Sequence, residues 1–429
     1  MTDGSPPEAE SVVSYIRDHP TELLATTHGL VAADTQNPPG NTRPLAEWLL
    51  RELRGLGYDC ERFCVDPQKP NVVATLPGQS EVTLLYNGHL DTVPFQASEW
   101  SRDPLGELDG DRLYGRGTTD MKGAIGAMLQ VARAFARTDT TPPVTVQFAF
   151  VSDEEVAGDA GLSTRLRTDR LDPDACVVGE ATGREGVDSL AVGDRGYVWP
   201  TLTVEGTAAH GSRPMFGANA IDRLYGVLEE CRSRLRGIDV PTDGFDDAVV
   251  EESIRYYGRQ LDRERAAGLF RSPTVNLGRL NGGDAVNSVP ASAEARLDIR
   301  VLPSVEPETV LAELRDCTAG EDVTITDITW TEGTYTEPST PLVRAATDVA
   351  RATLGTPVYR RFATGSGDAQ AFREHGVPTI EFATGTGTVH GTDEYTTREK
   401  LLGNAVAYAR LPFRFARRHG GGRPPPEPS

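Results

Sequence analysis

Cysteine is scarce in this sequence. The 429 residues include five, an odd number at wide spacing. A disulfide framework would need a denser and even set. Cys60 and Cys64 are close together, but no second Cys or His pair accompanies them at the spacing of a zinc site. We therefore expect reduced thiols at all five positions, which are Cys60, Cys64, Cys176, Cys231 and Cys317.

Long apolar segments are also missing. No run of eighteen apolar residues occurs in the sequence, so a transmembrane helix is not expected. The first ten residues, MTDGSPPEAE, are acidic and contain proline, whereas a secretory signal begins with basic residues followed by an apolar stretch. The expected location is cytoplasmic, with no membrane partner.

Positive charge is in short supply. Lys and Arg number 43 against 63 Asp and Glu, which gives a formal net charge of −20. Nucleic acids and anionic membranes bind basic surfaces, so neither is expected as a partner. Only three basic residues are lysines. A carboxylate-rich, lysine-poor surface is typical of halophilic proteins, which stay hydrated at high salt. An acidic mesophilic protein encoded with a high-GC codon bias is the alternative.

The apolar pattern predicts a large α/β domain. A chain of this length is too long for one ordinary core, so two domains are expected. Continuous apolar runs that end in turn signals alternate with helical patterns, which is typical of a mixed, mainly parallel sheet with helices on both faces. The predicted strands lie at 71–76, 82–87, 144–151 and 175–180. We assign residues 1–194 and 336–417 to this domain, and 418–429 to a disordered tail.

A smaller domain interrupts the large one. From about residue 195 to 335 the pattern changes to alternating strands and helices in the order β-α-β-β-α-β, which predicts an inserted α+β domain. Within it, residues 238–270 form a mostly acidic stretch that the pattern does not assign to any element.

Histidine and carboxylate side chains follow the predicted strands of the large domain. The carboxyl ends of strands line the ligand crevice of an open α/β sheet, so these side chains are expected to converge there. Their types, His and carboxylate without Cys, suit Zn²⁺ or another borderline divalent ion. Five ligands exceed the three of one catalytic zinc but suit two ions that share a bridging carboxylate. The candidates are His89, Asp91, Asp120, Glu154, Glu155, Glu180 and His390.

Two pairs within this set have distinct geometry. Asp91 lies two residues after His89, so in extended chain both point the same way, and Asp91 could hold the second imidazole nitrogen. Glu154 and Glu155 are adjacent and point in opposite directions. One could therefore bind metal while the other serves as general base for a bridging water.

These residues lie in motifs that resemble a known family. The motifs are GHLDTVP at 88–94, YGRGTTDMKG at 114–123, DEE at 153–155, VGE at 178–180 and the late His390. They resemble the di-zinc family of acetylornithine deacetylase, succinyl-diaminopimelate desuccinylase and the glutamate carboxypeptidases, and the likeness extends from about residue 10 to 415.

The resemblance implies a role for each candidate. It implies one ion on His89, Asp120 and Glu180, and another on Asp120, Glu155 and His390, with Asp120 bridging. It further implies that Asp91 orients His89, that Glu154 is the general base, and that the peptide bond between residues 120 and 121 is cis. The implied ions are Zn²⁺, with Co²⁺ able to substitute.

The inserted domain resembles the family's lid and dimerisation domain. The segment around His210 matches the lid motif, whose histidine stabilises the oxyanion, often in the partner subunit's site. Asn287 and Arg300 match positions that bind the substrate carboxylate, and an arginine can do so through two hydrogen bonds. Gly365 and Ser366 lie in a glycine-rich segment that resembles a loop closing over that carboxylate. A homodimer through the inserted domain is expected.

The function predicted from the resemblance is hydrolysis of the amide bond of an N-acyl amino acid, in amino-acid biosynthesis. One alternative is a di-/tripeptidase or carboxypeptidase with the same metals. Another is a non-catalytic metal-binding scaffold, which predicts the loss of a ligand or of Glu154, and none is lost. The acyl group remains open.

Overall fold

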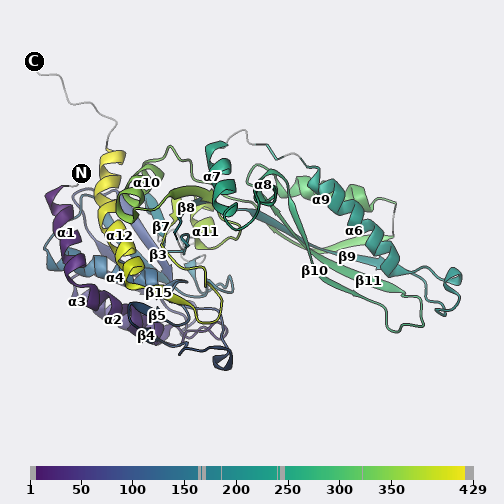
Figure 1. Ribbon diagram of the computed structural model, residues 1–429, viewed down its shortest axis with the longest axis horizontal. Helices are drawn as coiled ribbons and strands as arrows, with labels where there is room; N and C mark the ends of the chain where they lie inside the picture. The colour runs from purple at the N-terminus through teal and green to yellow at the C-terminus, as the bar shows by residue number, and fades with distance from the viewer. Residues whose placement is uncertain are drawn as a thin grey trace, which may run out of the picture. The chain divides into compact units, whose positions relative to one another are not determined.

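The protein forms two compact units, described here from a computed structural model (Figure 1). The structure describes residues 6–162, 166, 171–184, 186–238, 240–241, 247–320 and 322–420. Unit 1 consists of Met1–Val192, Thr336–Arg360 and Gly367–Ser429, and unit 2 of Gly193–Tyr335 and Arg361–Ser366.

Unit 1 begins with three helices and then alternates strands and helices. Its helices are α1 (Pro7–Asp18), α2 (Pro20–Val31), α3 (Arg43–Gly55), α4 (Lys122–Arg137), α10 (Pro341–Leu354), α11 (Asp368–Glu374) and α12 (Arg398–His419), with a 3-10 turn η1 (Ala97–Glu99). Its strands are β1 (Asp59–Phe63), β2 (Asn71–Leu76), β3 (Thr83–His89), β4 (Glu107–Asp109), β5 (Arg112–Tyr114), β6 (Thr145–Val151), β7 (Ala175–Val178), β8 (Asp188–Gly193), β13 (Val358–Phe362), β14 (Thr379–Glu381) and β15 (Tyr395–Thr397).

An eight-stranded sheet forms the centre of unit 1, with the order β1-β2-β6-β3-β7-β14-β8-β13. The four strands β6, β3, β7 and β14 run parallel, whereas β1, β2 and β8 join as antiparallel strands. The four sequence-predicted strands correspond to β2, β3, β6 and β7. The predicted α/β class with a mainly parallel core is therefore confirmed, although its flanks are antiparallel.

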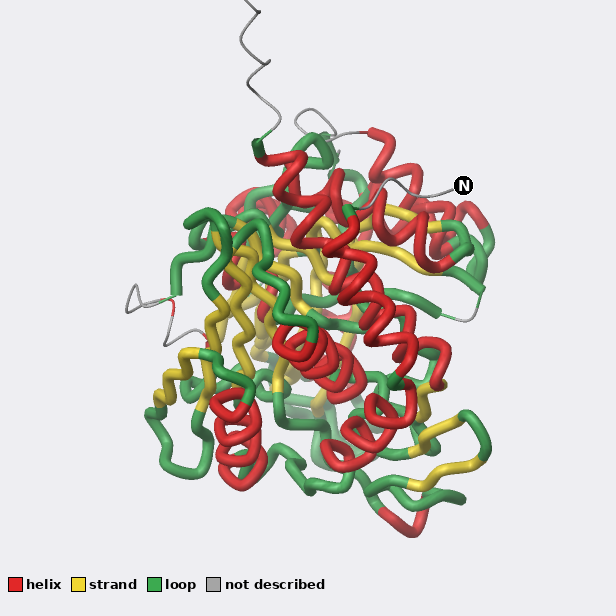
Figure 2. The backbone as a smooth tube through the Cα atoms, turned by 90° about the vertical axis from the view of Figure 1, so that its left-hand side faces the viewer, coloured by secondary structure: helices red, strands yellow, loops and turns green. Residues whose placement is uncertain are grey.

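Helices cover both faces of this sheet. Successive side chains of β3 point to opposite faces, and each contacts a helix. The Tyr86 side chain points to one face, where its hydroxyl donates to the Tyr408 carbonyl oxygen of α12 at 2.7 Å. Asn87 points to the opposite face, where its amide donates to Asp368 of α11 at 2.8 Å. In Figure 1 the yellow α12 lies beside the purple α1, although the two helices are at opposite ends of the sequence. Figure 2 shows the strands in yellow and the helices in red.

Two glycines let α4 approach the sheet closely. A Cβ at Gly88 of β3 would lie 2.9 Å from Ile125, and one at Gly179, just after β7, would lie 2.8 Å from Ala124. Both distances are too short for carbon atoms, so larger residues would push the helix away. This close packing fixes the N-terminus of α4 at the carboxyl ends of β3 and β7.

Unit 2 contains the predicted inserted domain. Its elements are β9 (Gly196–Glu205), a 3-10 turn η2 (Pro214–Phe216), α6 (Ala220–Arg236), α7 (Asp247–Tyr257), α8 (Arg263–Arg271), β10 (Thr274–Gly282), β11 (Ser292–Val301), α9 (Pro307–Thr318) and β12 (Val323–Thr331). The sheet has the antiparallel order β10-β11-β9-β12, and α6 and α9 pack on one face of it. The predicted β-α-β-β-α-β elements are present, with the two helices α7 and α8 added between the first helix and the second strand. The acidic stretch that the pattern left unassigned contains α7 and α8.

The prediction of five reduced thiols is wrong for two of them. Cys231 of α6 and Cys317 of α9 form a disulfide across 86 residues, with Cα atoms 5.6 Å apart. Both residues are buried where the two helices pack together. Cys60, Cys64 and Cys176 are free. The tertiary packing of α6 on α9 brings the pair together, and wide spacing in the sequence could not reveal it.

The chain crosses between the units at residues 192/193 and 335/336, and Arg361–Ser366 also belongs to unit 2. The expected disordered tail starts too early, since α12 continues to His419; residues 421–429 lie outside the described part. Among the helices that the structure describes, each is too short or too polar to cross a membrane.

Candidate metal centre

The parallel strands of unit 1 deliver polar side chains to one edge of the sheet. His89 is the last residue of β3, Glu154 and Glu155 follow β6, and Glu180 follows β7. Because these strands are adjacent and parallel, their carboxyl ends lie together. Asp120 comes from the turn before α4, and its peptide bond to Met121 is cis, as the resemblance implied.

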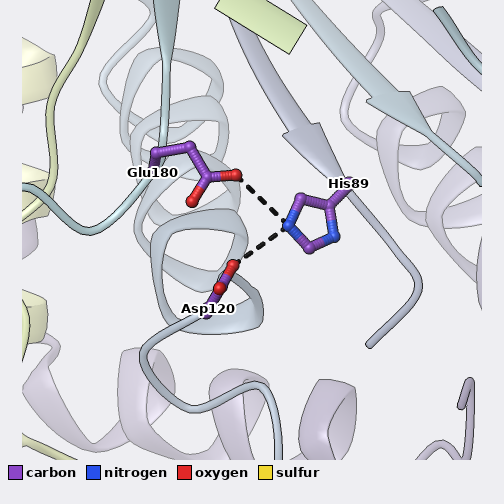
Figure 3. A group of neighbouring side chains, drawn as sticks. All are labelled: His89, Asp120 and Glu180. Carbon is purple, nitrogen blue, oxygen red and sulfur yellow. Dashed lines mark hydrogen bonds and ion pairs between the residues drawn. The ribbon is translucent and has the colours of Figure 1, made fainter. Parts of the chain in front are cut away.

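One group of possible ligands consists of His89, Asp120 and Glu180 (Figure 3). The Nε2 atom of His89 lies 3.1 Å from Oδ1 of Asp120 and 3.3 Å from Oε1 of Glu180. Because His89 Nδ1 lies 2.9 Å from the Asp91 backbone oxygen, the neutral ring carries its proton on Nδ1 and leaves Nε2 able to bind a cation. A cation shared by the three side chains accounts for both short distances.

A second group consists of Asp120, Glu155 and His390. The Nε2 atom of His390 lies 3.0 Å from Oδ2 of Asp120 and 3.4 Å from Oε2 of Glu155. Asp120 therefore presents one oxygen to each group. This is the arrangement of a carboxylate that bridges two metal ions.

Both groups fit a divalent ion in size and chemistry. A tetrahedral zinc with bonds of about 2.0–2.1 Å places its ligand atoms about 3.3 Å apart. The four distances from histidine nitrogen to carboxylate oxygen run from 3.0 to 3.4 Å, and all ligand atoms of each group lie within 4.8 Å of one another. Imidazole nitrogens and carboxylate oxygens are ligands for Zn²⁺ and similar ions. The residues present therefore fit two such ions.

The pKa values of the residues in these two groups are shifted because several carboxylates lie buried close together. Burial, and then the nearby Asp120, raises the pKa of Glu180 to about 8. Hydrogen bonds to Asp120 and Glu155 raise the pKa of His390 to about 10. Burial alone would raise the pKa of Asp120, but the hydrogen bonds from His390 and His89 lower it. Divalent ions would replace the protons that these residues retain, because metal ligands must be deprotonated.

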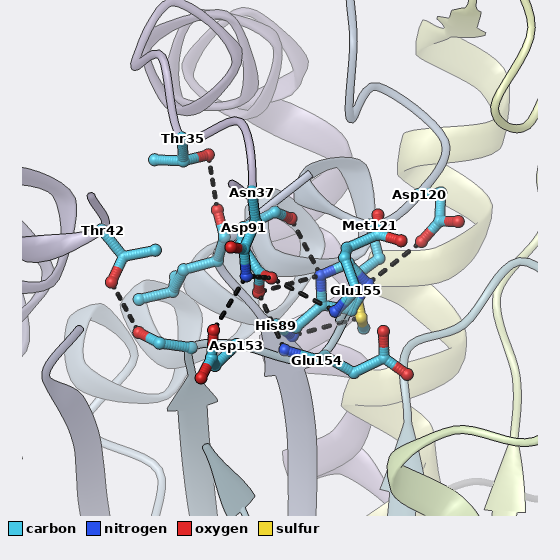
Figure 4. Close-up of polar contacts among 12 residues, drawn as sticks. Thr35, Asn37, Thr42, His89, Asp91, Asp120, Met121, Asp153, Glu154 and Glu155 are labelled. Carbon is cyan, nitrogen blue, oxygen red and sulfur yellow. Dashed lines mark hydrogen bonds and ion pairs between the residues drawn. The ribbon is translucent and has the colours of Figure 1, made fainter. Parts of the chain in front are cut away.

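The Asp91 carboxylate has a different partner from the one expected (Figure 4). His89 Nδ1 lies 2.9 Å from the backbone oxygen of Asp91 but 3.7 Å from its carboxylate. The carboxylate instead accepts the backbone N–H groups of Glu154 at 3.3 Å and Glu155 at 3.2 Å. Asp91 thus holds the turn that carries both glutamates, and it fixes the His89 ring through its main chain.

Asn37 is a residue that the sequence analysis missed. It is buried, and its amide nitrogen donates to Asp91 at 2.8 Å and to Asp153 at 2.9 Å (Figure 4). Asp153 also forms an ion pair with Lys69. Asn37 precedes two cis prolines in the sequence NPPG, which signals a turn but gives no indication of partners 54 and 116 residues away.

Glu154 lies beside the two groups without belonging to either. Burial, against the effect of His89, raises its pKa well above the usual value. A Cβ at Gly367, just before α11, would lie 2.7 Å from Oε1 of Glu154. Gly367 therefore lies directly beside this carboxylate, and a side chain at position 367 would require the end of the Glu154 side chain to move.

The remaining predicted residues belong to unit 2. His210 is exposed, and its Nδ1 lies 2.9 Å from the Ser212 hydroxyl. Asn287 is exposed on the connection between β10 and β11, and its backbone oxygen accepts the Gly211 N–H at 2.7 Å. The structure therefore brings His210 and Asn287 together. Gly365 and Ser366 are exposed residues of the segment before Gly367.

Arg300 lies at the other end of the unit 2 sheet. It pairs with Tyr197 near the start of β9, whereas His210 lies beyond the end of β9 at Glu205. Eight residues of strand span about 26 Å, and the ladder continues past Glu205 to the bridge between His210 and Ser288. Arg300 donates to Asp298 at 2.7 Å and lies 5.3 Å from the Tyr197 ring. One chain therefore does not bring Arg300 and His210 to the same small molecule.

The sequence and the fold both match known proteins. The pattern of peptidase family M20/M25/M40 matches residues 85–413. Acetylornithine deacetylase from Vibrio campbellii is 32% identical over 291 residues, which cover 66% of this chain and 68% of that protein. The crystal structure of an M20 family metallo-carboxypeptidase from Sulfolobus solfataricus has a TM-score of 0.73 at 21% identity, covering 91% of this chain and 99% of that one.

A dinuclear metal-binding peptidase of the M20 family from Bacillus subtilis has a TM-score of 0.62 at 15% identity, covering 92% of this chain and 98% of that one. Below 25% identity these structures show the common fold. The family match covers most of the chain, including His89, Asp120, Glu155, Glu180 and His390. The chain therefore belongs to peptidase family M20/M25/M40 and is a metal-dependent hydrolase of amide bonds.

Proposed function

We propose that this protein removes the acyl group from an N-acyl amino acid, using two metal ions held by His89, Asp120, Glu155, Glu180 and His390. The observation that carries the proposal is the pair of ligand groups sharing Asp120, with Glu154 beside them. The similarity to an acetylornithine deacetylase over two thirds of its length supports this substrate class.

The chain's own groups supply the proton transfers. Bound ions would polarise the scissile carbonyl and make the attacking water more acidic. Glu154 takes the proton from that water and returns it to the leaving nitrogen, as a general base and then a general acid. Asp91 holds Glu154 and Glu155 in place through their backbone N–H groups. Gly367 limits where the Glu154 carboxylate can move.

Substrate recognition is assigned to unit 2. We propose that Arg300, with Gly365 and Ser366 of the glycine-rich segment, binds the carboxylate of the substrate. His210 stabilises the oxyanion, and Asn287 supports the same substrate. Because Arg300 and His210 are separated by more than about 26 Å within unit 2, His210 and Asn287 would come from a second copy of the chain. This favours a homodimer formed through unit 2.

The finer assignments follow from chemistry. Zn²⁺ is the proposed ion, because the ligands are imidazole and carboxylate groups, and Co²⁺ would substitute. The net charge of −20 with three lysines supports an enzyme that works at high salt. The proposed cytoplasmic location rests on the acidic, proline-bearing N-terminal sequence, which does not resemble a secretory signal.

The test is a substrate panel at high salt with added Zn²⁺ or Co²⁺. It contains N-acetylornithine, N-succinyl-diaminopimelate, N-acyl-glutamates and dipeptides. Glu154→Gln is assayed beside the wild type, and its metal content is measured by elemental analysis. We expect turnover of one N-acyl amino acid, lost by about 10²–10⁴-fold in the variant, which still binds two ions.

Other outcomes would contradict the proposal. Cleavage of dipeptides alone would identify a peptidase. No turnover of any compound, with two ions bound per chain, would mean an acyl group outside the panel or the non-catalytic scaffold. Full activity in Glu154→Gln would remove this residue from the mechanism.

A further inference from the structure

The metal centre depends on two loops that are far apart in the sequence. Asp120 lies on the loop between β5 and α4, and His390 on the loop before β15. These loops provide the bridging carboxylate and the histidine of the second group. Their relative position therefore decides whether Asp120 and His390 can hold the same ion.

Glu394 joins the two loops. It lies four residues after His390, and its side chain is completely buried. Its Oε1 atom accepts the backbone N–H groups of Thr119 at 2.8 Å and Asp120 at 3.1 Å. Its Oε2 atom accepts the Gly117 N–H at 3.2 Å and Nη1 of Arg116 at 2.6 Å. Each carboxylate oxygen thus receives two donors from the Asp120 loop.

Arg116 completes the connection in the opposite direction. Its Nη1 atom binds Glu394, and its Nη2 atom donates to the backbone oxygen of His390 at 3.2 Å. The guanidinium is almost fully buried and lies 5.3 Å from the Trp100 ring. One arginine therefore contacts both the residue that holds the Asp120 loop and the main chain of the second histidine ligand.

Other contacts bring the loops together but do not fix the ligands directly. β15 pairs with β5 in an antiparallel ladder, and the Thr119 hydroxyl donates to the Tyr395 oxygen at 2.8 Å. The ladder lies at the base of the loops, and the Thr119 contact is made by a side chain one residue before Asp120. Glu394 and Arg116 act beside the ligands, because they bind the backbone of Asp120 and His390 themselves.

A carboxylate is required at position 394. It has enough lone pairs for four donors, and all four are present. A glutamine amide would present an NH₂ group on one side, facing two N–H donors. The backbone of the Asp120 loop would have to move to relieve that repulsion, although the side chain has almost the same volume.

We propose that Glu394, acting with Arg116, is a positioning residue that sets the spacing of Asp120 and His390 and thereby the affinity for the second metal ion. The inference rests on the two-metal function proposed above. Glu394 contacts no substrate, and it acts only through the backbone of two ligands. The ion on His89, Asp120 and Glu180 depends less on it, because β3 and β7 hold two of those ligands.

The experiment is a Co²⁺ titration of the metal-free full-length chain, followed by calorimetry and by the visible Co²⁺ spectrum. Glu394→Gln is compared with the wild type and with Glu399→Gln, a matched control at an exposed site on α12. In Glu394→Gln we expect the first ion to bind nearly as in the wild type. The second ion should bind about 10–100-fold more weakly, the usual effect of losing a residue that supports a metal ligand. Glu399→Gln should match the wild type.

A second variant covers the case in which Glu394→Gln does not fold. Arg116→Lys keeps the positive charge but cannot reach Glu394 and the His390 oxygen together, so it should also weaken the second ion selectively. Thermal unfolding of each metal-free variant separates positioning from stability. Unchanged affinity for the second ion in both variants would overturn the proposal. Equal loss of both ions together with a lower melting temperature would also overturn it, because that result indicates a structural role.

The test distinguishes this inference from the proposed function. Wild-type protein that binds two ions and hydrolyses no N-acyl amino acid would refute the substrate proposal and leave the role of Glu394 intact. Wild-type protein that binds one ion would refute both.

Discussion

Breaking the Cys231–Cys317 disulfide should destabilise unit 2 by a predictable amount. The bond closes a loop of 86 residues between α6 and α9. In the chain-entropy model, removing the bond lets the unfolded loop regain conformational entropy. For a loop of that length this stabilises the unfolded state by about 4.5 kcal/mol at 25 °C. Both cysteines are buried, so replacing each by alanine avoids leaving a polar group in the core.

Hydrogen exchange measured by mass spectrometry gives a local readout of this change. A loss of about 4.5 kcal/mol corresponds to exchange roughly 2,000-fold faster for amides that exchange only when unit 2 unfolds. The double variant Cys231→Ala/Cys317→Ala should show this acceleration in peptides from α6 and α9. Peptides from α4 in unit 1 provide the internal control and should exchange at the wild-type rate.

Two controls make the reasoning refutable. Reductant should accelerate exchange in the wild type and have no effect on the double variant. Thiol titration in denaturant without reductant should find three free thiols per chain, those of Cys60, Cys64 and Cys176. Five free thiols, or an acceleration below about tenfold in α6 and α9, would show that the loop-entropy argument does not apply to this bond.

Two further predictions concern unit 1. Gly367→Ala should lower kcat by about 10²-fold, since its Cβ would displace the Glu154 carboxylate. The metal content of this variant should stay at the wild-type level. The control Gly387→Ala, whose Cβ meets no atom within 4 Å, should be fully active. Partial burial raises the pKa of Asp348, but hydrogen bonds from two arginines of α12 lower it below its usual range. Its stabilising contribution is therefore complete above about pH 4 and disappears as pH falls through the folded-state pKa. The difference in urea midpoint between the wild type and Asp348→Asn should shrink below pH 4, and a difference that grows there would contradict this assignment.

The sequence could single out the possible metal ligands that the structure groups together, because several of them have a local signal. His89 ends a buried strand and Glu180 follows one, and the order of strands and helices indicates which ends meet. Residues that support the ligands lack such a signal. Glu394 follows a histidine in a polar turn, and its burial depends on the pairing of β15 with β5. Asn37 likewise acquires its function only from contacts with distant residues.

Some features were present in the sequence and were still missed. The segment of α7 buries Val249, Val250, Ser253, Ile254 and Tyr257, at helical spacing. The abundance of acid in residues 238–270 obscured this pattern. The disulfide is different in kind, because five cysteines allow many pairings and sequence spacing does not select among them.

The strands of the unit 1 sheet do not lie in the order in which the ribosome makes them. β14 lies between β7 and β8, yet it is made about two hundred residues after β7, once all of Gly193–Tyr335 has been translated. A nascent chain that ends before α10 already contains His89, Asp120 and Glu180 but lacks His390. Unit 2 can fold during translation, as domains generally do, whereas the sheet of unit 1 cannot be complete until β14 has been made. The group of Asp120, Glu155 and His390 is therefore complete only when translation is nearly finished.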